Sequence, residues 1–276
     1  MVPVSAQGGS GPGGSGPGGN VVSLRVVRAD VNQPSPRPGD TAATDPALDL
    51  VLDNPAWASL TGAHAHLGEG NDLARRFRSD VSPFSAVRDW SDPDVWAAIL
   101  DLVGYDADFL AAPHEDVPVP AGWAHGNTLH GVQLVETAQV AARPDEEAVV
   151  LGAADVPEMI DLVERAQPGP FLTRTHELGR YVGLRRDGRL VAMAGERLRP
   201  GGWVELSAVA TDERYRGQGL ASRLALDVVH HARERGERTF LHATADNTTA
   251  IRLYEHLGFA LRRGVTFGSV RTPAAP

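Results

Sequence analysis

The amino-acid sequence predicts a mixed α/β fold for the second half of the chain. Short segments alternate apolar and polar residues, as strands do, and longer segments repeat apolar residues at helical spacing. From Glu147 onward the two kinds of segment follow each other in the order β-α-β-β-β-α-β-α-β. This order predicts a sheet with mixed strand directions and helices packed on its faces.

The first four of these elements have clear boundary signals. Residues 147–155 predict a strand and a loop, and Asp155 is a suitable N-cap for a helix over residues 156–167. A proline in the first turn of this helix fits, because the N–H it lacks would have no partner there. Residues 180–198 predict a hairpin, since Asp187-Gly188 is a strong two-residue turn signal between alternating segments.

The later elements are bounded by glycines. A Pro-Gly-Gly turn precedes a strand over residues 203–211. The helix over residues 219–235 repeats apolar residues every four positions, and Gly236 ends it. The remaining segments predict a strand over 239–245, a helix over 247–259 and a closing strand over 260–268.

Charge and composition divide the chain into three regions. The N-terminal region is rich in glycine, proline and serine without apolar periodicity, which predicts a disordered tail. Between Asp45 and Ala142 there are fifteen Asp and Glu against four Arg, whereas from Arg143 to the end there are eighteen against nineteen. The predicted regions are a tail over 1–45, an N-terminal α/β domain of unknown role over 46–142, which has a helix over 92–104 and a strand over 131–141, and a domain over 143–276.

The composition of the chain excludes several classes of function. A formal net charge of -9 makes the protein a poor general binder of nucleic acid. No apolar run is long enough to span a membrane, and no secretion signal is visible at the N-terminus. Cysteine is absent, which excludes disulfides and thiolate chemistry and fits a cytoplasmic protein. Lysine is absent as well, so Schiff-base chemistry is excluded.

The segment RYRGQGLASRL, from Arg214 to Leu224, predicts a phosphate-binding loop. Glycines at the start of a helix let an anion approach the free backbone N–H groups and the positive end of the helix dipole. Arginines beside them add positive charge. The plainer interpretation is an ordinary strand-to-helix turn with surface arginines. A P-loop is excluded because it needs a lysine, and the third glycine of a dinucleotide-binding loop is replaced by Ser222.

Two motifs together give this loop a context. The pattern R-x-x-G-x-G-[LA] is followed about thirty residues later by N-x-x-A-I-x-L-Y-x-x-L-G-F, from Asn247 to Phe259. This combination resembles the GNAT superfamily of acyl-CoA-dependent N-acetyltransferases over about residues 147–267. The nearest group is the one related to glycine N-acyltransferases. The resemblance implies the GNAT fold, with a mostly antiparallel sheet and helices on both faces, preceded by a smaller α/β half that is itself a degenerate GNAT-like unit.

The resemblance also implies a set of site residues. Asn247 matches the side chain that contacts the cofactor arm, and Tyr254 matches the tyrosine that protonates the leaving thiolate. Without the motif, Tyr254 would be interpreted as a core aromatic residue. The end of the strand matches the segment that pairs with the pantetheine arm, and the loop matches the pyrophosphate site. The residues concerned are Val209, Ala210 and Thr211 in the strand and Arg214, Tyr215, Arg216, Gly217, Gln218, Gly219, Leu220 and Ala221 in the loop.

Two residues are candidates for the general base. Period-two alternation along residues 203–211 places Glu205 on the same face as Val209, whose backbone N–H is the expected donor to the thioester carbonyl. His242 lies on the next strand, and histidine has a suitable pKa. Structural roles for both, or water as the base, are the alternatives.

No metal site is expected. The spacing of His64, His66 and Glu69 lacks a third histidine at helical spacing, and His230-His231 are expected to point in different directions as surface residues.

The predicted function is transfer of an acetyl group from acetyl-CoA to an amine by direct transfer in a ternary complex. The alternative is a non-catalytic acyl-CoA-binding regulator. The N-terminal half lacks the glycine loop and should not bind CoA. Its surplus of carboxylates would favour a cationic acceptor, and the plainer interpretation is a solvated surface. A further alternative is that this half contacts a protein substrate. The expected partners are acetyl-CoA and an amine acceptor, with no nucleic acid or membrane, and the protein is expected to be a monomer or a homodimer.

Overall fold

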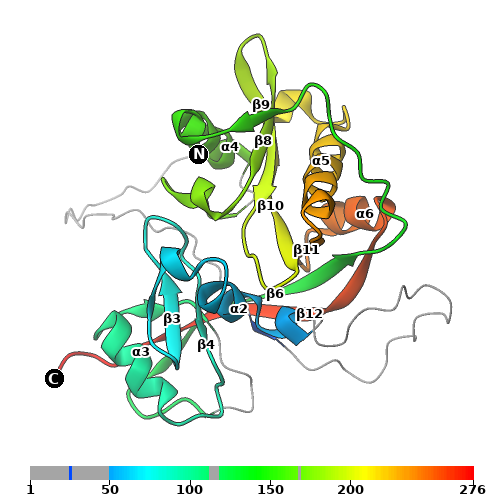
Figure 1. Cartoon of the computed structure of the whole chain (residues 1–276). Coiled ribbons are helices and arrows are strands. Elements are labelled where there is room, and N and C mark those ends of the chain that lie inside the picture. The colour runs from blue at the N-terminus through cyan, green and yellow to red at the C-terminus, as the bar shows by residue number, and fades with distance from the viewer. Residues whose placement is uncertain (1–24, 27–49, 112–117, 167–168) are drawn as a thin grey trace, which may run out of the picture.

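The computed structural model describes residues 25–26, 50–111, 118–166 and 169–276 (Figure 1). Most of the predicted tail over residues 1–45 therefore lies outside the described residues. Within it, Arg25–Val26 form strand β1, which pairs antiparallel with Val265 and Thr266. This part of the predicted tail is thus a short strand at the edge of the sheet, and the disorder of the tail stays a prediction.

One large sheet dominates the structure, and all but one of its pairings are antiparallel (Figure 1). The exception is the parallel pair β10–β11. In spatial order, the described strands are β1 (Arg25–Val26), β12 (Phe259–Arg271), β6 (Ala124–Glu136), β11 (Arg238–Thr244), β10 (Trp203–Thr211), β9 (Arg189–Glu196), β8 (Tyr181–Arg186) and β7 (Val149–Leu151), with β5 (Asp108–Phe109) also paired to β12.

Strand β6 comes before the predicted break between Ala142 and Arg143, but it lies inside the sheet that the second half forms. It pairs antiparallel with β11 on one side and with β12 on the other. The predicted strand over residues 131–141 overlaps β6 only at residues 131–136. The observed strand starts earlier, at Ala124, and ends at Glu136, so the prediction of strand is wrong for residues 137–141, which include a turn. The division into 46–142 and 143–276 stays a prediction, but the sheet crosses this boundary without interruption.

Helices cover both faces of the sheet, as the fold class predicts. The helices α5 (Leu220–Glu234) and α6 (Thr248–His256) lie on one face, where Leu224, Val228 and Tyr254 pack against Leu206 and Leu241. The helix α4 (Val156–Ala166) covers the other face beside β8 and β9, through Met159 and Leu162. Burial of these apolar side chains is the main stabilising contribution to the arrangement.

The predicted hairpin is confirmed. Asp187 and Gly188 have φ values of 51° and 78°, as a two-residue turn with two left-handed residues requires. The predicted cap at Asp155 is wrong in detail. Asp155 lies in a 3-10 turn, Ala153–Asp155, and its carboxylate accepts a hydrogen bond from the backbone N–H of Gly152 instead of capping the helix that follows.

The described part of the N-terminal half folds as an α/β unit. Its small sheet has the order β2 (Gly68–Gly70), β3 (Ala74–Phe77) and β4 (Ser85–Val87), and its helices are α2 (Pro55–Thr61) and α3 (Val95–Val103). This unit packs its core, including Leu60 and Phe77, on Trp203 and Phe240 of the large sheet. His64 is buried at this junction and its Nε2 atom is 2.9 Å from the carbonyl oxygen of Leu178.

In the described parts of the chain, no helix is both long enough and apolar enough to cross a membrane.

Candidate active site

The site is built where β10 and β11 separate. The two strands pair in parallel from Trp203 and Arg238 to Glu205 and Phe240, and no further pairs form although both strands continue. The strands therefore diverge beyond this point and leave unpaired strand edges facing each other. An extended ligand can place its amides between such edges and hydrogen-bond to them as an added strand would.

A β-bulge changes the direction of the side chains in the second part of β10. The register with β9 shifts between Ser207 and Ala210, and Ala208 has a φ of 51°. A bulge inserts one residue and so reverses the alternation that follows it. Val209 consequently packs with Leu206 against α5, on the opposite face from Glu205. The expectation that Glu205 and Val209 share a face is wrong, because simple alternation ignores the bulge.

The glycine loop is open and well shaped for an anion. Gly217 and Gly219 have φ values of 76° and 72°, which favour glycine, and Gly219 is the N-cap residue of α5 without a side-chain cap. A Cβ atom at either glycine would meet nothing within 4 Å. The N–H groups of the first turn of α5 are not used within the helix, so they can donate to a bound phosphate.

The two arginines of the loop differ in their surroundings. Arg214 is paired with Asp212 at 3.2 Å, and the same carboxylate also accepts from the guanidinium of Arg165. The hydrogen bonds from the side chain and the backbone N–H of Arg214 hold the pKa of Asp212 well below its ordinary value. Arg216 is exposed and, within the described residues, no hydrogen bond or ion pair involves its side chain. Arg216 is therefore the arginine with its charge available to a ligand, whereas Arg214 fixes the loop.

Tyr254 lies on α6 and is 7 % exposed. Its ring packs edge-on against Phe259, with the ring centroids 5.9 Å apart. Burial raises the pKa of its hydroxyl well above the ordinary value. Among the described residues the hydroxyl has no hydrogen-bond partner, so its proton is available to a ligand.

Asn247 is the N-cap of α6. Its Oδ1 atom accepts a hydrogen bond from the backbone N–H of Ala250 at 3.1 Å. The side-chain amide group of Asn247 has no partner in the part of the chain that the structure describes and is exposed. The residue can thus cap the helix that carries Tyr254 and still donate to a ligand lying beside β11.

Glu205 and His242 meet just at the point where the strands separate. The Nδ1 atom of His242 is 2.7 Å from Oε1 of Glu205, and both side chains are almost completely buried. Arg197 donates two hydrogen bonds to the same carboxylate, of 2.6 and 2.8 Å. Burial alone would raise the pKa of Glu205, but the charge of Arg197 and the bonds from Arg197 and His242 outweigh it and lower this pKa to about 2.

The other ring nitrogen of His242 is also occupied. Its Nε2 atom is 3.0 Å from the amide nitrogen of Gln133, which also donates to the carbonyl of Leu52. The oxygen of that amide accepts a hydrogen bond from Arg262, which fixes the orientation of the amide. Because the amide nitrogen can only donate, Nε2 of His242 accepts and Nδ1 carries the proton that is donated to Glu205.

Burial lowers the pKa of His242 despite the neighbouring carboxylate. The imidazole is therefore neutral, with one nitrogen donating and the other accepting. A carboxylate held by an arginine and an imidazole with both nitrogens engaged are poorly placed to take a proton from an incoming amine.

Three partners of this cluster, Arg197, Gln133 and Arg262, are not among the site residues that the sequence predicts. The contact of Arg197 with Glu205 could have been predicted from the sequence. A hairpin centred on Gly201 places the two residues directly across from each other, and the backbone hydrogen bond between them shows this pairing. Gln133 and Arg262 could not be paired from the pattern, since they depend on β6 lying between β11 and β12.

Comparisons with known proteins support the fold and identify relatives of the chain. The FR47-like protein family matches residues 181–267. N-alpha-acetyltransferase RimI of Mycobacterium tuberculosis is 33% identical over 129 residues, which are 42% of this chain and 80% of RimI. Mycothiol acetyltransferase of Thermomonospora curvata is 39% identical over 75 residues, which are 27% of this chain and only 25% of that relative. The chain thus spans a quarter of one relative and most of the other.

Solved structures of acetyltransferases are similar to this chain over most of its length. A protein from Novosphingobium aromaticivorans that is assigned to the GNAT family of acetyltransferases has a TM-score of 0.72 and is 37% identical, with 81% of this chain and 99% of that chain covered. A GCN5-related N-acetyltransferase from Kribbella flavida, 19% identical, shares the fold with a TM-score of 0.57 over 82% of this chain and 96% of its own.

The fold and these relatives define the class of the protein as that of the N-acetyltransferases. The chain belongs to the GNAT superfamily. Its finer placement near the group related to glycine N-acyltransferases stays a prediction.

Proposed function

We propose that the protein transfers an acetyl group from acetyl-CoA to an amine. The observation that carries the proposal is the position of the open glycine loop, at the start of α5, beside the gap between β10 and β11. The loop can bind the diphosphate of CoA, and the gap can hold its pantetheine arm as an added strand. Val209, Ala210, Thr211 and Asn247 would contact the arm, and the residues from Arg214 to Ala221 would form the diphosphate site.

The transfer step uses the residues around the gap. The backbone N–H of Val209, in the bulged part of β10, would polarise the thioester carbonyl, so that charge developing on its oxygen is stabilised. The amine nitrogen attacks the carbonyl carbon directly, because the chain has no cysteine to form an acyl-enzyme. The C–S bond breaks, and Tyr254 donates its proton to the departing thiolate.

The amine must lose a proton during the reaction. Glu205 and His242 have their proton-accepting atoms engaged by Arg197 and Gln133. Their role in this proposal is therefore to fix β10 and β11 at the point of separation, with water as the acceptor of the proton. This positioning role differs from a role as general base, and the two roles predict different pH dependences of the turnover rate when either residue is replaced.

Two observations guide the choice of acceptor amine. The name of RimI describes an N-alpha-acetyltransferase, which makes the α-amine of a peptide a sensible first substrate. The surplus of carboxylates in the N-terminal half, fifteen against four arginines between Asp45 and Ala142, would favour a cationic acceptor. A cytoplasmic location and a monomeric or homodimeric state are part of the same proposal.

A thiol-release assay tests the function. Acetyl-CoA and longer acyl-CoAs are each offered with peptides, polyamines and aminoglycosides, and the free CoA thiol is measured. Acetyl-CoA with at least one amine is expected to give turnover. Binding of CoA by calorimetry without turnover on any amine would favour a regulator that only binds acyl-CoA, and the absence of CoA binding would reject the proposal.

A further inference from the structure

The C-terminal end of α5 carries three side chains with metal-binding atoms close together. They are His230, His231 and Glu234, and one ligand atom from each lies within 4.8 Å of the other two. Neighbouring residues on a helix point about 100° apart, which is why the sequence predicted that the two histidines diverge. In the structure their ring centroids are 5.1 Å apart, so the side chains converge and that prediction is wrong.

The carboxylate of Glu234 lies between the two imidazoles. Its Oε2 atom is 2.7 Å from Nδ1 of His231, and its Oε1 atom is 3.6 Å from Nε2 of His230. The two histidine side chains are each 29% exposed and the glutamate is 57% exposed, so all three can be reached from solvent and can rotate.

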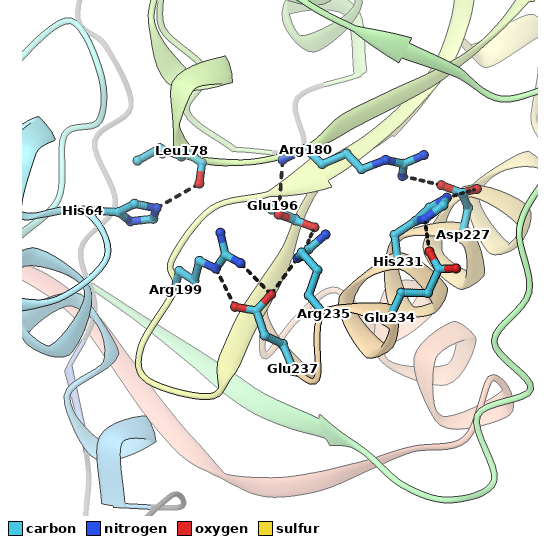
Figure 2. Close-up of polar contacts among 10 residues, drawn as sticks. All are labelled: His64, Leu178, Arg180, Glu196, Arg199, Asp227, His231, Glu234, Arg235 and Glu237. Atoms are coloured by element: carbon cyan, nitrogen blue, oxygen red, sulfur yellow. Dashed lines mark hydrogen bonds and ion pairs between the residues drawn. The ribbon is translucent and has the colours of Figure 1, made fainter.

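A buried carboxylate, that of Asp227, lies next to His231 (Figure 2). Asp227 is 2% exposed, and its Oδ1 atom is 3.6 Å from Nε2 of His231. It is held in place by Arg180 at 2.6 Å and by the backbone N–H of Asp145 at 3.0 Å. A carboxylate behind the second nitrogen of a histidine is the arrangement that orients histidine ligands in metal sites.

We propose that His230, His231 and Glu234 form a binding site for a divalent transition-metal ion of the zinc class, with Asp227 orienting His231. Two imidazoles, one carboxylate and no sulfur suit zinc, which takes three protein ligands and a water molecule in open sites. The ion would take the place of a proton at Nδ1 of His231, and the neutral ring would carry its one remaining proton on Nε2, which faces Asp227.

The local geometry and charge fit such an ion. Tetrahedral ligands at bond lengths of about 2.0 Å lie about 3.3 Å from each other, and small rotations of exposed side chains would bring the present spacing to that value. The site is in the last two turns of α5, where the helix dipole favours a cation. The glycine loop is at the opposite end of the same helix, so the metal would stabilise α5 and take no part in acyl transfer.

Calorimetry with zinc on the full chain, with no affinity tag, tests the site. The wild-type protein is expected to bind one ion, and His230→Ala and Glu234→Gln are each expected to weaken binding at least about tenfold. The double variant His230→Ala/His231→Ala should lose the binding. His256→Ala is the matched control, because this exposed histidine is also in the last turn of a helix, and it should bind as the wild type does.

A second measurement separates loss of metal from loss of fold. Zinc should raise the melting temperature of the wild type but not that of the double variant, since a ligand bound only by the folded state stabilises it. Both proteins should have the same circular dichroism and the same acyl-transfer rate. The proposal is overturned if the wild type gives no saturable heat with zinc, or if the double variant binds with wild-type affinity.

Discussion

The Nδ1 atom of His242 lies 2.7 Å from Oε1 of Glu205, and this contact joins the last residue of β10 that pairs with β11 to a residue just beyond the end of the pairing on β11. Arg197 and Gln133 complete the hydrogen bonding of the pair. The arrangement resists changes in spacing at the mouth of the gap, because a shift of either strand would break several buried hydrogen bonds.

Acid should weaken the protein through Glu205. Its pKa is 4.5 ordinarily and about 2 in the folded state, so the folded state prefers the charged form. The stabilisation is fully present above pH 4.5 and is lost as the pH falls toward 2, and it amounts to about 3 kcal/mol. The lowered pKa of His242 acts in the same direction below its ordinary value of 6.5, since the unfolded chain then binds the extra proton.

Urea unfolding at several pH values measures this effect. Glu205→Gln should be less stable at neutral pH by about 3–5 kcal/mol, because Arg197 is left buried without its partner. The stability of Glu205→Gln should also change less than that of the wild type between pH 5 and pH 3, because the variant has no carboxylate at this position to become protonated. Glu69→Gln, which breaks an exposed ion pair with Arg76, is the control and should change stability by less than about 1 kcal/mol. Parallel pH profiles for Glu205→Gln and the wild type would contradict the assignment.

His242→Gln tests whether His242 is the base. If His242 only positions the strands, turnover should fall at every pH and the pH–rate profile should keep its shape. A base that merely deprotonates the incoming ammonium would give a variant that recovers at high pH, where the amine is already neutral. His256→Gln, an exposed change on α6, should leave the profile as it is in the wild type. Steady-state rates from mild acid to alkaline pH decide between the two roles.

Tyr254→Phe keeps the ring packed against Phe259 and removes the hydroxyl alone. If Tyr254 protonates the thiolate, kcat should fall on the order of 10²-fold while the affinity for acetyl-CoA stays the same. The diphosphate contacts are elsewhere, at the glycine loop, which is why the two quantities should separate. Tyr105→Phe, an exposed tyrosine, serves as the control. Unchanged turnover under conditions where chemistry limits the rate would leave Tyr254 as a core residue.

Gly217→Ala and Gly217→Glu test the loop. Both force a side chain into left-handed backbone, and the glutamate adds a negative charge where the diphosphate should bind, so binding of acetyl-CoA should weaken with alanine and vanish with glutamate. Gly236 has a φ of 75° and equally open surroundings at the other end of α5, which makes Gly236→Ala and Gly236→Glu matched controls for strain. Equal CoA affinities in calorimetry for the Gly217 and Gly236 variants would refute the loop assignment.

The sequence predicts the second half of the fold well, because local signals define its elements. The Asp187-Gly188 turn, the glycine at the start of α5 and the four-residue repeat within it depend on neighbouring residues alone. The bulge at Ala208 was not predictable in this way, since a non-glycine residue with positive φ leaves no mark in an alternating pattern. This is why simple alternation predicts the wrong face for Val209.

The other features that could not be predicted from the sequence are contacts between distant segments and side-chain rotamers. Glu205 and His242 were both chosen from the pattern, and the structure brings them together, but the engagement of their acceptor atoms depends on Gln133 and Arg197. The convergence of His230 and His231 depends on rotamers, which a helical wheel does not contain.

The position of β6 between β11 and β12 has a consequence for how the protein is made. The ribosome completes β6 well before either strand that flanks it, as the contact between Glu136 and Thr239, 103 residues apart, illustrates. During synthesis β6 therefore has neither neighbour, and the sheet can close only when the last strand has emerged. Pairing of strands that are so far apart in the sequence is slow. The nascent chain should therefore depend on chaperones that cover the unpaired edges of β6 until β11 and β12 have been made.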